Sequence, residues 1–385
     1  MRASITPWSI EKLGLDRSDI EDRSDNFLSL PVHTYFDPAV FDFELDAVFA
    51  RRWQFFAPVA QLADPGDTVT GDVGRVPVVV VRGDDGALRG FVNACRHRGH
   101  PVVKEDGCRR RLVCGYHGWT YRLDGALVHA RDAESDPGFC REALSLLPVA
   151  VDQWAQCVFV NTDPDAVPLR RAHPRLEPLA SEGGFDTDPE RYRPHSETVV
   201  DVAANWKLWY DNGVECYHCP SIHGESFAAA FDVSPERNVP ILTDHLMNSR
   251  FVSPAARDGH TLRSNRFCSF QLFPGCQLIQ HDDVLVLARI VPTGAQSCRF
   301  IVHYLAERDA DPDRVEAWIA LWNRTYDEDT GAVERQQKGL CSGRVSRLRY
   351  VPAREKPALF INALIREAYR EALDEPPPAA RAAFG

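Results

Sequence analysis

The sequence has no long apolar run. The longest one, VPVVVV, covers residues 76–81 of a 385-residue chain, whereas a membrane-spanning helix needs roughly 18 apolar residues. The first 25 residues alternate charged side chains with isolated apolar ones, and they lack the apolar core and the small-residue cleavage site of a signal peptide. We therefore expect a globular protein that does not contact a membrane and stays in the cytoplasm.

Extended clusters of positive charge are also missing. The net charge is −11 at pH 7, and no long run of Lys or Arg occurs. A protein that binds nucleic acid normally carries such a basic footprint, so we expect no nucleic-acid partner. The net charge by itself says nothing about a small-molecule substrate.

Cysteine, by contrast, is plentiful, with eleven residues in the chain. In a reducing compartment these residues are expected to be thiols or metal ligands before disulfides, so their spacing must decide their role. With 44% hydrophobic and 26% charged residues, a chain of this length can build sizeable cores and should form two domains.

The first half of the chain predicts a small β domain. Residues 1–50 are expected to form an N-terminal arm and an amphipathic helix, because apolar residues recur there at three- and four-residue intervals. Runs of β-branched residues broken by tight-turn sequences follow, a pattern typical of antiparallel strands. A segment rich in Pro, Asp and Arg begins after residue 161 and marks a linker. We therefore assign residues 51–165 to this domain.

The second half, residues 166–385, predicts a sheet with helices against it. Strands are expected at residues 277–280, 284–291 and 298–305, separated by turn sequences. A long helix should follow Asp311, because Asp-Pro is a favourable helix start and apolar residues then share one face up to residue 340. A second helix is expected at residues 357–373. The overall fold class is therefore α+β.

A first group of potential metal ligands lies in the β domain. Cys95 and His97 form a C-x-H pair, and Cys114 and His117 form a C-x-x-H pair after sixteen intervening residues. Thiolate and imidazole ligands suit either zinc or an iron-sulfur cluster. A zinc finger normally separates its cysteines from its histidines, whereas each pair here supplies one of each. The mixed pairs favour a two-iron cluster in which one iron takes both cysteines and the other both histidines.

A second group lies in the sequence ECYHCPSIH, which starts at Glu215 and ends at His223. On an uninterrupted helix, His218 and His223 would point about 140° apart and could not share a metal. Pro220 should end the helix before it, so that His218 lies on the last turn and His223 returns from the following loop. Glu215 would lie on the same helical face as His218 and could accept a hydrogen bond from its ring.

Two histidines alone are a weak sign of a metal site, but iron enzymes that activate dioxygen commonly add one carboxylate. The long helix offers several candidates, and physical reasoning from the sequence does not choose among them. These candidates are Asp327, Glu328, Asp329 and Glu334.

Together the two groups resemble the motifs of the Rieske non-haem iron oxygenases, in their catalytic (alpha) subunit. That family combines an antiparallel β Rieske domain with a helix-grip (START-like) catalytic domain, which has an antiparallel sheet and long C-terminal helices. Its iron ligands come from an H-x4-H segment and a later D-x4-E-x2-Q helix, which Asp329, Glu334 and Gln337 match. The resemblance implies a Rieske 2Fe-2S cluster, a mononuclear non-haem Fe(II) and Asp329 as the third iron ligand.

The resemblance also implies how electrons would arrive. In the family, the position of Glu215 carries the carboxylate that links the iron ligand His218 to a Rieske histidine of the neighbouring subunit, here His117. This arrangement implies a ring-shaped homo-oligomer, most simply a homotrimer. The implied reaction is a monooxygenation that uses O2 and electrons from NAD(P)H. We expect a separate flavin and iron-sulfur reductase, because the chain has no G-x-G-x-x-G motif on a strand-turn-helix.

The substrate is less constrained by the sequence. The combination Glu-Cys-Tyr-His-Cys is similar to the branch of the family that acts on quaternary or methylated amines, by hydroxylation or oxidative N-demethylation. Trp206, Trp209 and Phe251 could contribute to an aromatic cage for such a cation. The alternatives are a ring-hydroxylating aromatic or specialised-metabolite oxygenase, a non-catalytic Rieske electron-transfer protein, and a zinc-stabilised interaction module.

Overall fold

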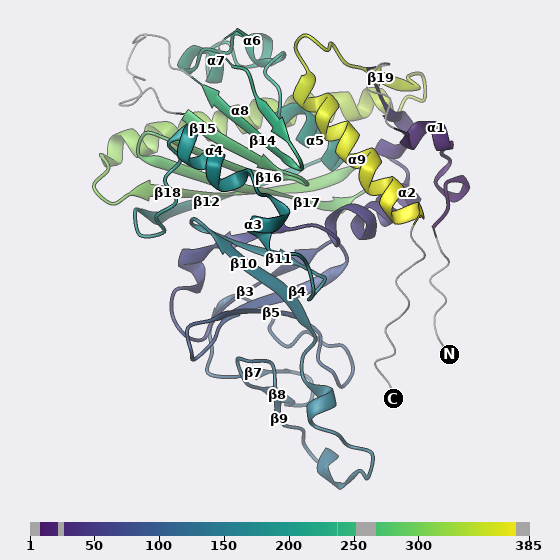
Figure 1. Cartoon of the computed structure of the whole chain (residues 1–385), viewed down its shortest axis with the longest axis vertical. Coiled ribbons are helices and arrows are strands. Elements are labelled where there is room, and N and C mark those ends of the chain that lie inside the picture. The colour runs from purple at the N-terminus through teal and green to yellow at the C-terminus, as the bar shows by residue number, and fades with distance from the viewer. Residues whose placement is uncertain (1–7, 22–26, 237, 252–266, 375–385) are drawn as a thin grey trace.

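Two seven-stranded antiparallel sheets are the largest sheets of the structure (Figure 1). The computed structural model describes residues 8–21, 27–236, 238–251 and 267–374. The first sheet and a small three-stranded sheet form the lower part of the molecule in Figure 1, and the second sheet with the long helices forms the upper part. Among the described helices, none combines the length and apolar composition needed to cross a bilayer.

The first sheet buries one of its inner strands, β4 (Val76–Arg82), on both faces. In β4, residues 78, 80 and 79, 81 alternate between two separate small cores, and all four valines are fully buried. Burial on both faces explains why this strand reads as a continuous apolar run rather than as an alternating one. Across the sheet, the strands are β2 (Gln54–Pro58), β11 (Cys157–Asn161), β10 (Pro148–Trp154), β5 (Leu88–Val92), β4 (Val76–Arg82), β3 (Asp67–Val73) and β6 (Gly107–Cys108).

A three-stranded sheet lies at the far tip of this part of the molecule (Figure 1). It consists of β7 (Leu112–Val113), β8 (Thr120–Tyr121) and β9 (Leu127–His129). The turns that carry both Cys/His pairs lie beside it.

The second sheet separates two cores, because its side chains alternate between its faces. In β17, Val284 and Val286 face a core shared with the helices, whereas Leu285 and Leu287 face the first sheet. In order, the strands are β12 (Tyr192–Val202), β18 (Ser297–Glu307), β17 (Val284–Gly294), β16 (Cys276–His281), β15 (Phe267–Leu272), β14 (Leu246–Phe251) and β13 (Ile241–Thr243). The three strands predicted in this region are confirmed as β16, β17 and β18.

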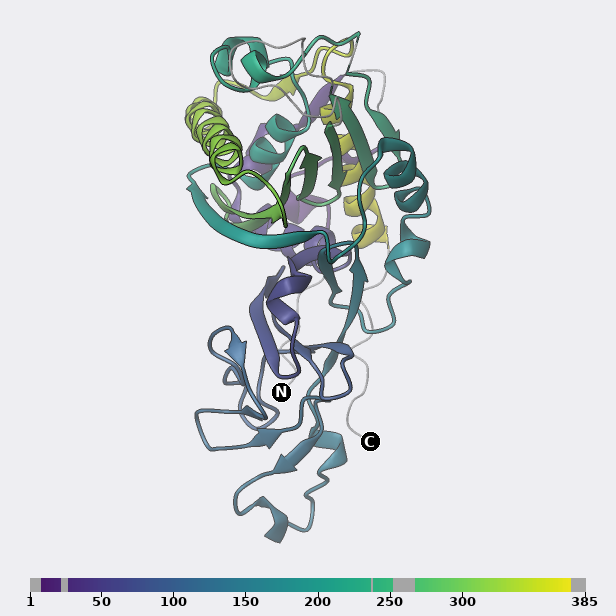
Figure 2. The same ribbon diagram turned by 90° about the vertical axis from the view of Figure 1, so that its left-hand side faces the viewer.

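The long helix α8 (Pro312–Leu340) packs against the inner face of this sheet, as Figure 2 shows. Asp311 accepts a hydrogen bond from the backbone N–H of Asp313 at its start, so the predicted helix and its cap are confirmed. The second predicted helix is α9 (Lys356–Asp374). Shorter helices are α3 (Leu169–Ala172), α4 (Leu176–Gly183), α5 (Trp206–Gly213), α6 (Cys219–Ile222) and α7 (Phe227–Ala230).

The N-terminal segment packs into the second half of the molecule. Its strand β1 (Leu28–Pro31) pairs with β19 (Arg347–Arg349), more than 300 residues later. Its helix α2 (Pro38–Glu44) continues as a single π-helical turn, η3 (Leu45–Phe49), and both contribute to the core of α5, α8 and α9. Two short elements, η1 (Glu11–Leu13) and α1 (Arg17–Ile20), precede them.

A buried ion pair connects these elements. Glu44 of α2 and Lys207 of α5 have no exposed side-chain surface, and Nζ of Lys207 lies 2.6 Å from Oε1 of Glu44. The same carboxylate accepts hydrogen bonds from Trp206 Nε1 at 2.7 Å and from the Tyr369 hydroxyl on α9. Lys207 also donates to the backbone carbonyl of Thr34. The charges are therefore compensated by hydrogen bonds as well as by each other, which is the condition for burying them.

The two large sheets share a continuous core. Trp154 of β10 makes an edge contact with Phe270 of β15, with ring centroids 5.7 Å apart, and both belong to one buried cluster with Phe55 and Leu287. The indole N–H of Trp53 also donates to the backbone carbonyl of Val167 at 2.9 Å. The two parts of the molecule are thus held together by apolar packing rather than by a bare linker.

We expect the Glu44–Lys207 pair to dominate the stability of the second half. Replacing one partner, in Glu44→Gln or Lys207→Met, leaves the other uncompensated and should cost about 3–5 kcal/mol in the free energy of unfolding. The double variant should be less destabilised than either single variant. Denaturant unfolding followed by tryptophan fluorescence measures these changes.

The exposed Arg122–Asp124 pair provides the control for this experiment. Its side chains are 51% and 41% exposed, so Asp124→Asn should change the free energy of unfolding by less than about 0.5 kcal/mol. Single variants of Glu44 and Lys207 that behave like this control would contradict the assigned role.

Candidate metal centres

The two Cys/His pairs lie on two similar turns at the tip. The N–H of Gly99 donates to the carbonyl of Cys95 at 2.8 Å, and the N–H of Gly118 donates to the carbonyl of Cys114 at 3.0 Å. Both glycines have left-handed backbone conformations, with φ of 71° and 75°, which explains the choice of glycine at these two positions.

These turns separate the thiols from the imidazoles. The side chains of Cys95 and Cys114 are buried, whereas His97 and His117 lie at the surface with ring centroids 4.7 Å apart. Burial raises the pKa of the Cys95 thiol, the hydroxyl of Tyr121 at 3.3 Å lowers it, and the neighbouring Cys114 thiol raises it further. A cation at this position would oppose the rise by favouring the thiolate.

The spacing of the donor atoms fits a cluster better than a single zinc ion. Among the described residues, only His218, His223 and Asp329 form a group of three or more potential ligands whose donor atoms all lie within 4.8 Å of one another. Three donors from the tip therefore do not converge on one point, whereas the ligands of one tetrahedral zinc would lie about 3.3–3.8 Å apart. Paired inner thiols and paired outer imidazoles instead match the two irons of a Rieske cluster.

The segment between α5 and α7 carries the second centre, but its local structure differs from the prediction. Helix α5 ends at Gly213, so Glu215 and His218 do not share a helical face. Pro220 does not end a helix; it lies in the first turn of α6, where its missing N–H costs nothing. His218 and His223 then flank this single turn as its N-cap and C-cap residues. The short helix α6 brings both rings to one side of the segment. The prediction had expected a loop in its place.

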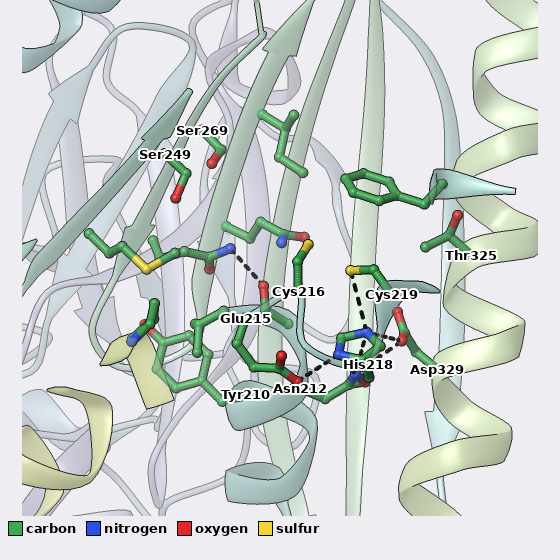
Figure 3. Close-up of a pocket in the computed structure, with 18 of the residues that line it drawn as sticks. Tyr210, Asn212, Glu215, Cys216, His218, Cys219, Ser249, Ser269, Thr325 and Asp329 are labelled. Carbon is green, nitrogen blue, oxygen red and sulfur yellow. Dashed lines mark hydrogen bonds and ion pairs between the residues drawn. The ribbon is translucent and has the colours of Figure 1, made fainter. Parts of the chain in front are cut away.

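His218, His223 and Asp329 converge at the end of a cavity (Figure 3). Nε2 of His218 lies 3.2 Å from Nε2 of His223, and Oδ1 of Asp329 lies 2.9 Å from His223 Nε2 and 3.4 Å from His218 Nε2. Asp329 projects from α8, opposite the histidine segment. Two imidazoles and one carboxylate that share one side are the donor set of mononuclear non-haem iron sites.

In addition to Asp329, one further carboxylate orients each imidazole. Oε1 of Glu215 lies 2.6 Å from Nδ1 of His218, and Oε2 of Glu328 lies 2.7 Å from Nδ1 of His223. Each Nδ1 can donate its proton outward, which leaves Nε2 free to bind a metal. Burial alone would lower the pKa of His218, but the carboxylates of Asp329 and Glu215 raise it to about 10. This group of histidines and carboxylates therefore has enough negative charge to hold a cation.

Glu328 was one of four carboxylates that the sequence left open, and its position beside His223 was not predicted. The hydroxyl of Ser226 donates to Glu328 at 2.5 Å, and Arg324 donates to its other oxygen at 3.0 Å. A carboxylate adjacent to a ligand on the same helix is the only sequence signal for this role. Asp327 is exposed and lies outside the group.

The remaining residues of the D-x4-E-x2-Q pattern hold the backbone of α5 rather than a metal. The N–H of Ala203 donates to Glu334, and the N–H of Asn205 donates to Gln337, both at 2.9 Å. These bonds fix α8 against the start of α5. Asn212 near the end of α5 then donates to Oδ1 of Asp329 at 3.1 Å. Asn212 was not predicted as a site residue, because a single Asn on a helix carries no metal-ligand pattern.

A mostly apolar cavity extends from this centre to the inner face of the second sheet (Figure 3). Of the three residues considered for an aromatic cage, Trp209 lines the cavity. Trp206 is instead buried in the core against Glu44, because its indole N–H needs that acceptor. The side chain of Phe251 lies outside the described residues. The aromatic residues that line the cavity are Trp209, Tyr210, Phe227, Phe267, Phe300, Trp322 and Tyr326.

Comparison with known families assigns both parts of the chain. Residues 52–149 match the model of the Rieske [2Fe-2S] domain, and residues 189–371 match the model of the ring hydroxylating alpha subunit (catalytic domain). The chain belongs to the Rieske non-haem iron oxygenases. Both the predicted family and the predicted fold class are confirmed, and the cofactors of this family are a Rieske 2Fe-2S cluster and a mononuclear non-haem iron.

Several relatives of this chain are named for quaternary ammonium substrates. It is 35% identical to the carnitine monooxygenase oxygenase subunit of Escherichia coli (strain K12) over 196 residues, 51% of this chain and 52% of that one. The chain therefore spans about half the length of the carnitine monooxygenase relatives it matches. It is 29% identical to the glycine betaine monooxygenase oxygenase subunit of Chromohalobacter salexigens over 367 residues, 82% of this chain and 80% of that one.

A solved structure has the same fold. The quaternary ammonium Rieske monooxygenase CntA in complex with L-carnitine is 26% identical, with a TM-score of 0.78 over 90% of this chain and 97% of that one.

We expect Asp329→Ala to remove the mononuclear iron and leave the Rieske cluster intact. Glu328→Gln should weaken iron binding about 10–100-fold, because it loosens His223 without removing a ligand. Asp327→Asn, on the exposed side of the same helix, is the matched control and should bind iron normally. Iron and acid-labile sulfide analysis after reconstitution, with the visible spectrum of the cluster, measures all three. Loss of iron from the Asp327 variant but not from the Asp329 variant would reverse the assignment.

Proposed function

We propose that this protein is the oxygenase component of a Rieske monooxygenase that acts on a small quaternary or methylated ammonium compound. Cys95, His97, Cys114 and His117 hold the 2Fe-2S cluster. A second set, His218, His223 and Asp329, holds the mononuclear iron. The observation that carries the proposal is the presence of both donor sets in one chain, the second of them open to an aromatic cavity.

When bound, the cluster supplies one-electron transfer and the mononuclear iron supplies dioxygen chemistry. The residues of the chain prepare this site. Glu215 and Glu328 keep both imidazoles in the tautomer that presents Nε2, and Asp329 faces them with its carboxylate. Aromatic side chains line the cavity that leads to the same point.

The cavity also suits a cationic head group. Aromatic faces attract quaternary ammonium ions through the ring quadrupole, and Trp209, Phe300 and Tyr326 lie in the wall. Glu215 and Asp329 are the only carboxylates among the described lining residues, so negative charge is concentrated at the iron site. A methylated nitrogen would therefore be drawn toward that site, where hydroxylation or oxidative N-demethylation would take place.

We infer that electrons pass between subunits of a homotrimer. In Figure 1, strands β7 and β8, which flank the turn of Cys114 and His117, lie at the opposite end of the molecule from α6, which His218 and His223 flank. Neither centre is therefore placed to serve the other within one chain. Glu215, which already contacts His218, is the bridging residue toward His117 of a neighbouring copy. A cyclic arrangement of copies supplies this pairing at every site.

Electrons reach the cluster from NAD(P)H through a separate reductase. The exposed positions of His97 and His117 support this route, because a partner can approach the cluster directly. We place the protein in the cytoplasm, where its eleven free cysteines would stay reduced.

Metal analysis of the reconstituted protein tests the proposal first. We expect about three irons and two acid-labile sulfides per chain, with visible absorption that bleaches on reduction. Oxygen uptake with a reductase, NAD(P)H and a panel of methylated amines then tests the activity. Zinc without sulfide, or iron without any substrate-dependent oxygen uptake across the panel, would refute it.

The Glu215→Gln variant tests the route between subunits. The side-chain carbonyl of Gln can still accept a hydrogen bond from Nδ1 of His218, so we expect both metals to remain bound. Turnover should fall at least about 100-fold, because the carboxylate that couples the two centres is lost. Single-turnover reduction of the iron site, followed spectroscopically through oxidation of the cluster, measures this step. An unchanged rate in the variant would exclude Glu215 as the bridge.

A further inference from the structure

Two serine hydroxyls face each other in the wall of the cavity. Ser249 on β14 and Ser269 on β15 are directly opposed partners of the antiparallel ladder, so their side chains project on the same face of the sheet. Both line the cavity, and in Figure 3 they lie across it from Asp329 and His218. They therefore form one polar site at the end of the cavity that faces away from the metal ligands.

Neither hydroxyl is engaged by the part of the protein that the structure describes. Each serine is only 4% exposed, and no hydrogen bond joins either hydroxyl to another described residue. A hydroxyl that lines a cavity and has no protein partner is available to a bound water or to a ligand. Strand positions that face a core normally carry apolar residues, as Met247 and Ile279 do in the same wall. A polar pair at this position points to a bound polar group.

Two glutamine side chains of the same wall already contact protein. Nε2 of Gln271 donates to the carbonyl of Gly213, and Oε1 of Gln277 accepts from the hydroxyl of Tyr326. Both bonds are long, at 3.4 and 3.3 Å, but they direct these amide atoms toward protein rather than toward the serines. The Tyr210 hydroxyl and Oδ1 of Asn238, also in the lining, have no partner among the described residues. The serine pair differs from them because it offers two adjacent hydroxyls on one face of the sheet.

The charge of the lining restricts what the pair can bind. Arg354 is the only Lys or Arg among the described lining residues, and its guanidinium lies 5.2 Å from the ring centre of Tyr217, a side chain that is 47% exposed. This places Arg354 at the outer rim. A carboxylate held by two neutral hydroxyls would lose its hydration without gaining a buried counter-charge. A hydroxyl, carbonyl or amide would exchange one set of hydrogen bonds for another.

We propose that Ser249 and Ser269 form the specificity site for the tail of the substrate, and that this tail is a neutral hydrogen-bonding group. This inference rests on the proposed function, which places the cationic head at the iron site. The preferred substrate class is then an ammonium compound with an alcohol or other uncharged polar end, rather than one with a carboxylate end.

A matched ligand series tests this assignment by calorimetric binding to the anaerobic holoprotein. The probes are trimethylammonium alcohols with chains of two to five carbons, their alkyl analogues without the hydroxyl, and trimethylammonium carboxylates of the same lengths. We expect the best alcohol to bind about tenfold more tightly than its alkyl analogue, the effect of one or two buried hydrogen bonds. In the Ser249→Ala/Ser269→Ala variant this ratio should fall below about twofold.

Thr325→Val is the control for removing a hydroxyl near the cavity, because the Thr325 hydroxyl donates to the Leu321 carbonyl within α8. The preference for the alcohol should survive in this variant. Full iron and sulfide content in every variant establishes that the fold is intact. Equal binding of alcohols and alkyl analogues in the unmodified protein, or tightest binding by carboxylates, would overturn the assignment.

Neutral alcohols in which a tert-butyl group replaces the trimethylammonium group separate the two levels of inference. If these bind as tightly as the cations and the serine variant weakens them, the ammonium part of the proposed function fails while the serine site stands. If cations bind but the serine variant leaves every affinity unchanged, the serine site fails while the proposed function stands. Absence of binding by every alcohol of both series overturns the serine site.

Discussion

The ion pair between Glu44 and Lys207 is the constraint on which the architecture of the second half depends. Neither side chain is exposed, and the carboxylate is shared by residues of α5 and α9. Since a charge buried in this way is tolerated only with its partners in place, α2, α5 and α9 have one relative arrangement. Helix α5 in turn carries Asn212 to Asp329. Glu44 and Lys207 do not contact His218, His223 or Asp329, yet the packing that they hold in place contributes to the geometry of this proposed iron site.

Helix α8 extends this order to the opposite side of the site. Along one helix, Asp329 faces the histidines, Glu328 orients one of them, and Glu334 and Gln337 hold the backbone ahead of α5. A carboxylate ligand on a straight, packed helix moves little, whereas ligands on a short loop can adjust. The site therefore combines one rigid donor with two histidines that a single helical turn and two carboxylates orient.

The sequence was sufficient to predict most regular elements, but the choice of Asp329 among four carboxylates needed the resemblance to a family. Spacing identified the Cys/His pairs, the two histidines and the long helices, because those features depend on residues close together in the chain. The position of Pro220 was misjudged, since a proline fits the first turn of a helix as well as it ends one. The packing of β1 against β19 was not predictable from local patterns, because the strands are separated by most of the chain. The role of Trp206 likewise required knowing that Glu44 lies beside it.

The shared core between the two large sheets has a mechanical consequence. Trp154, Phe270 and their neighbours pack the two parts of the molecule against each other in one buried cluster. This packing holds the part of the molecule that carries the Cys/His pairs in place, so we expect no motion that brings it to the proposed iron site of its own chain. An isolated chain would contain both proposed metal centres but no route for electrons between them. Association of several copies, rather than motion within one chain, would bring the two centres together.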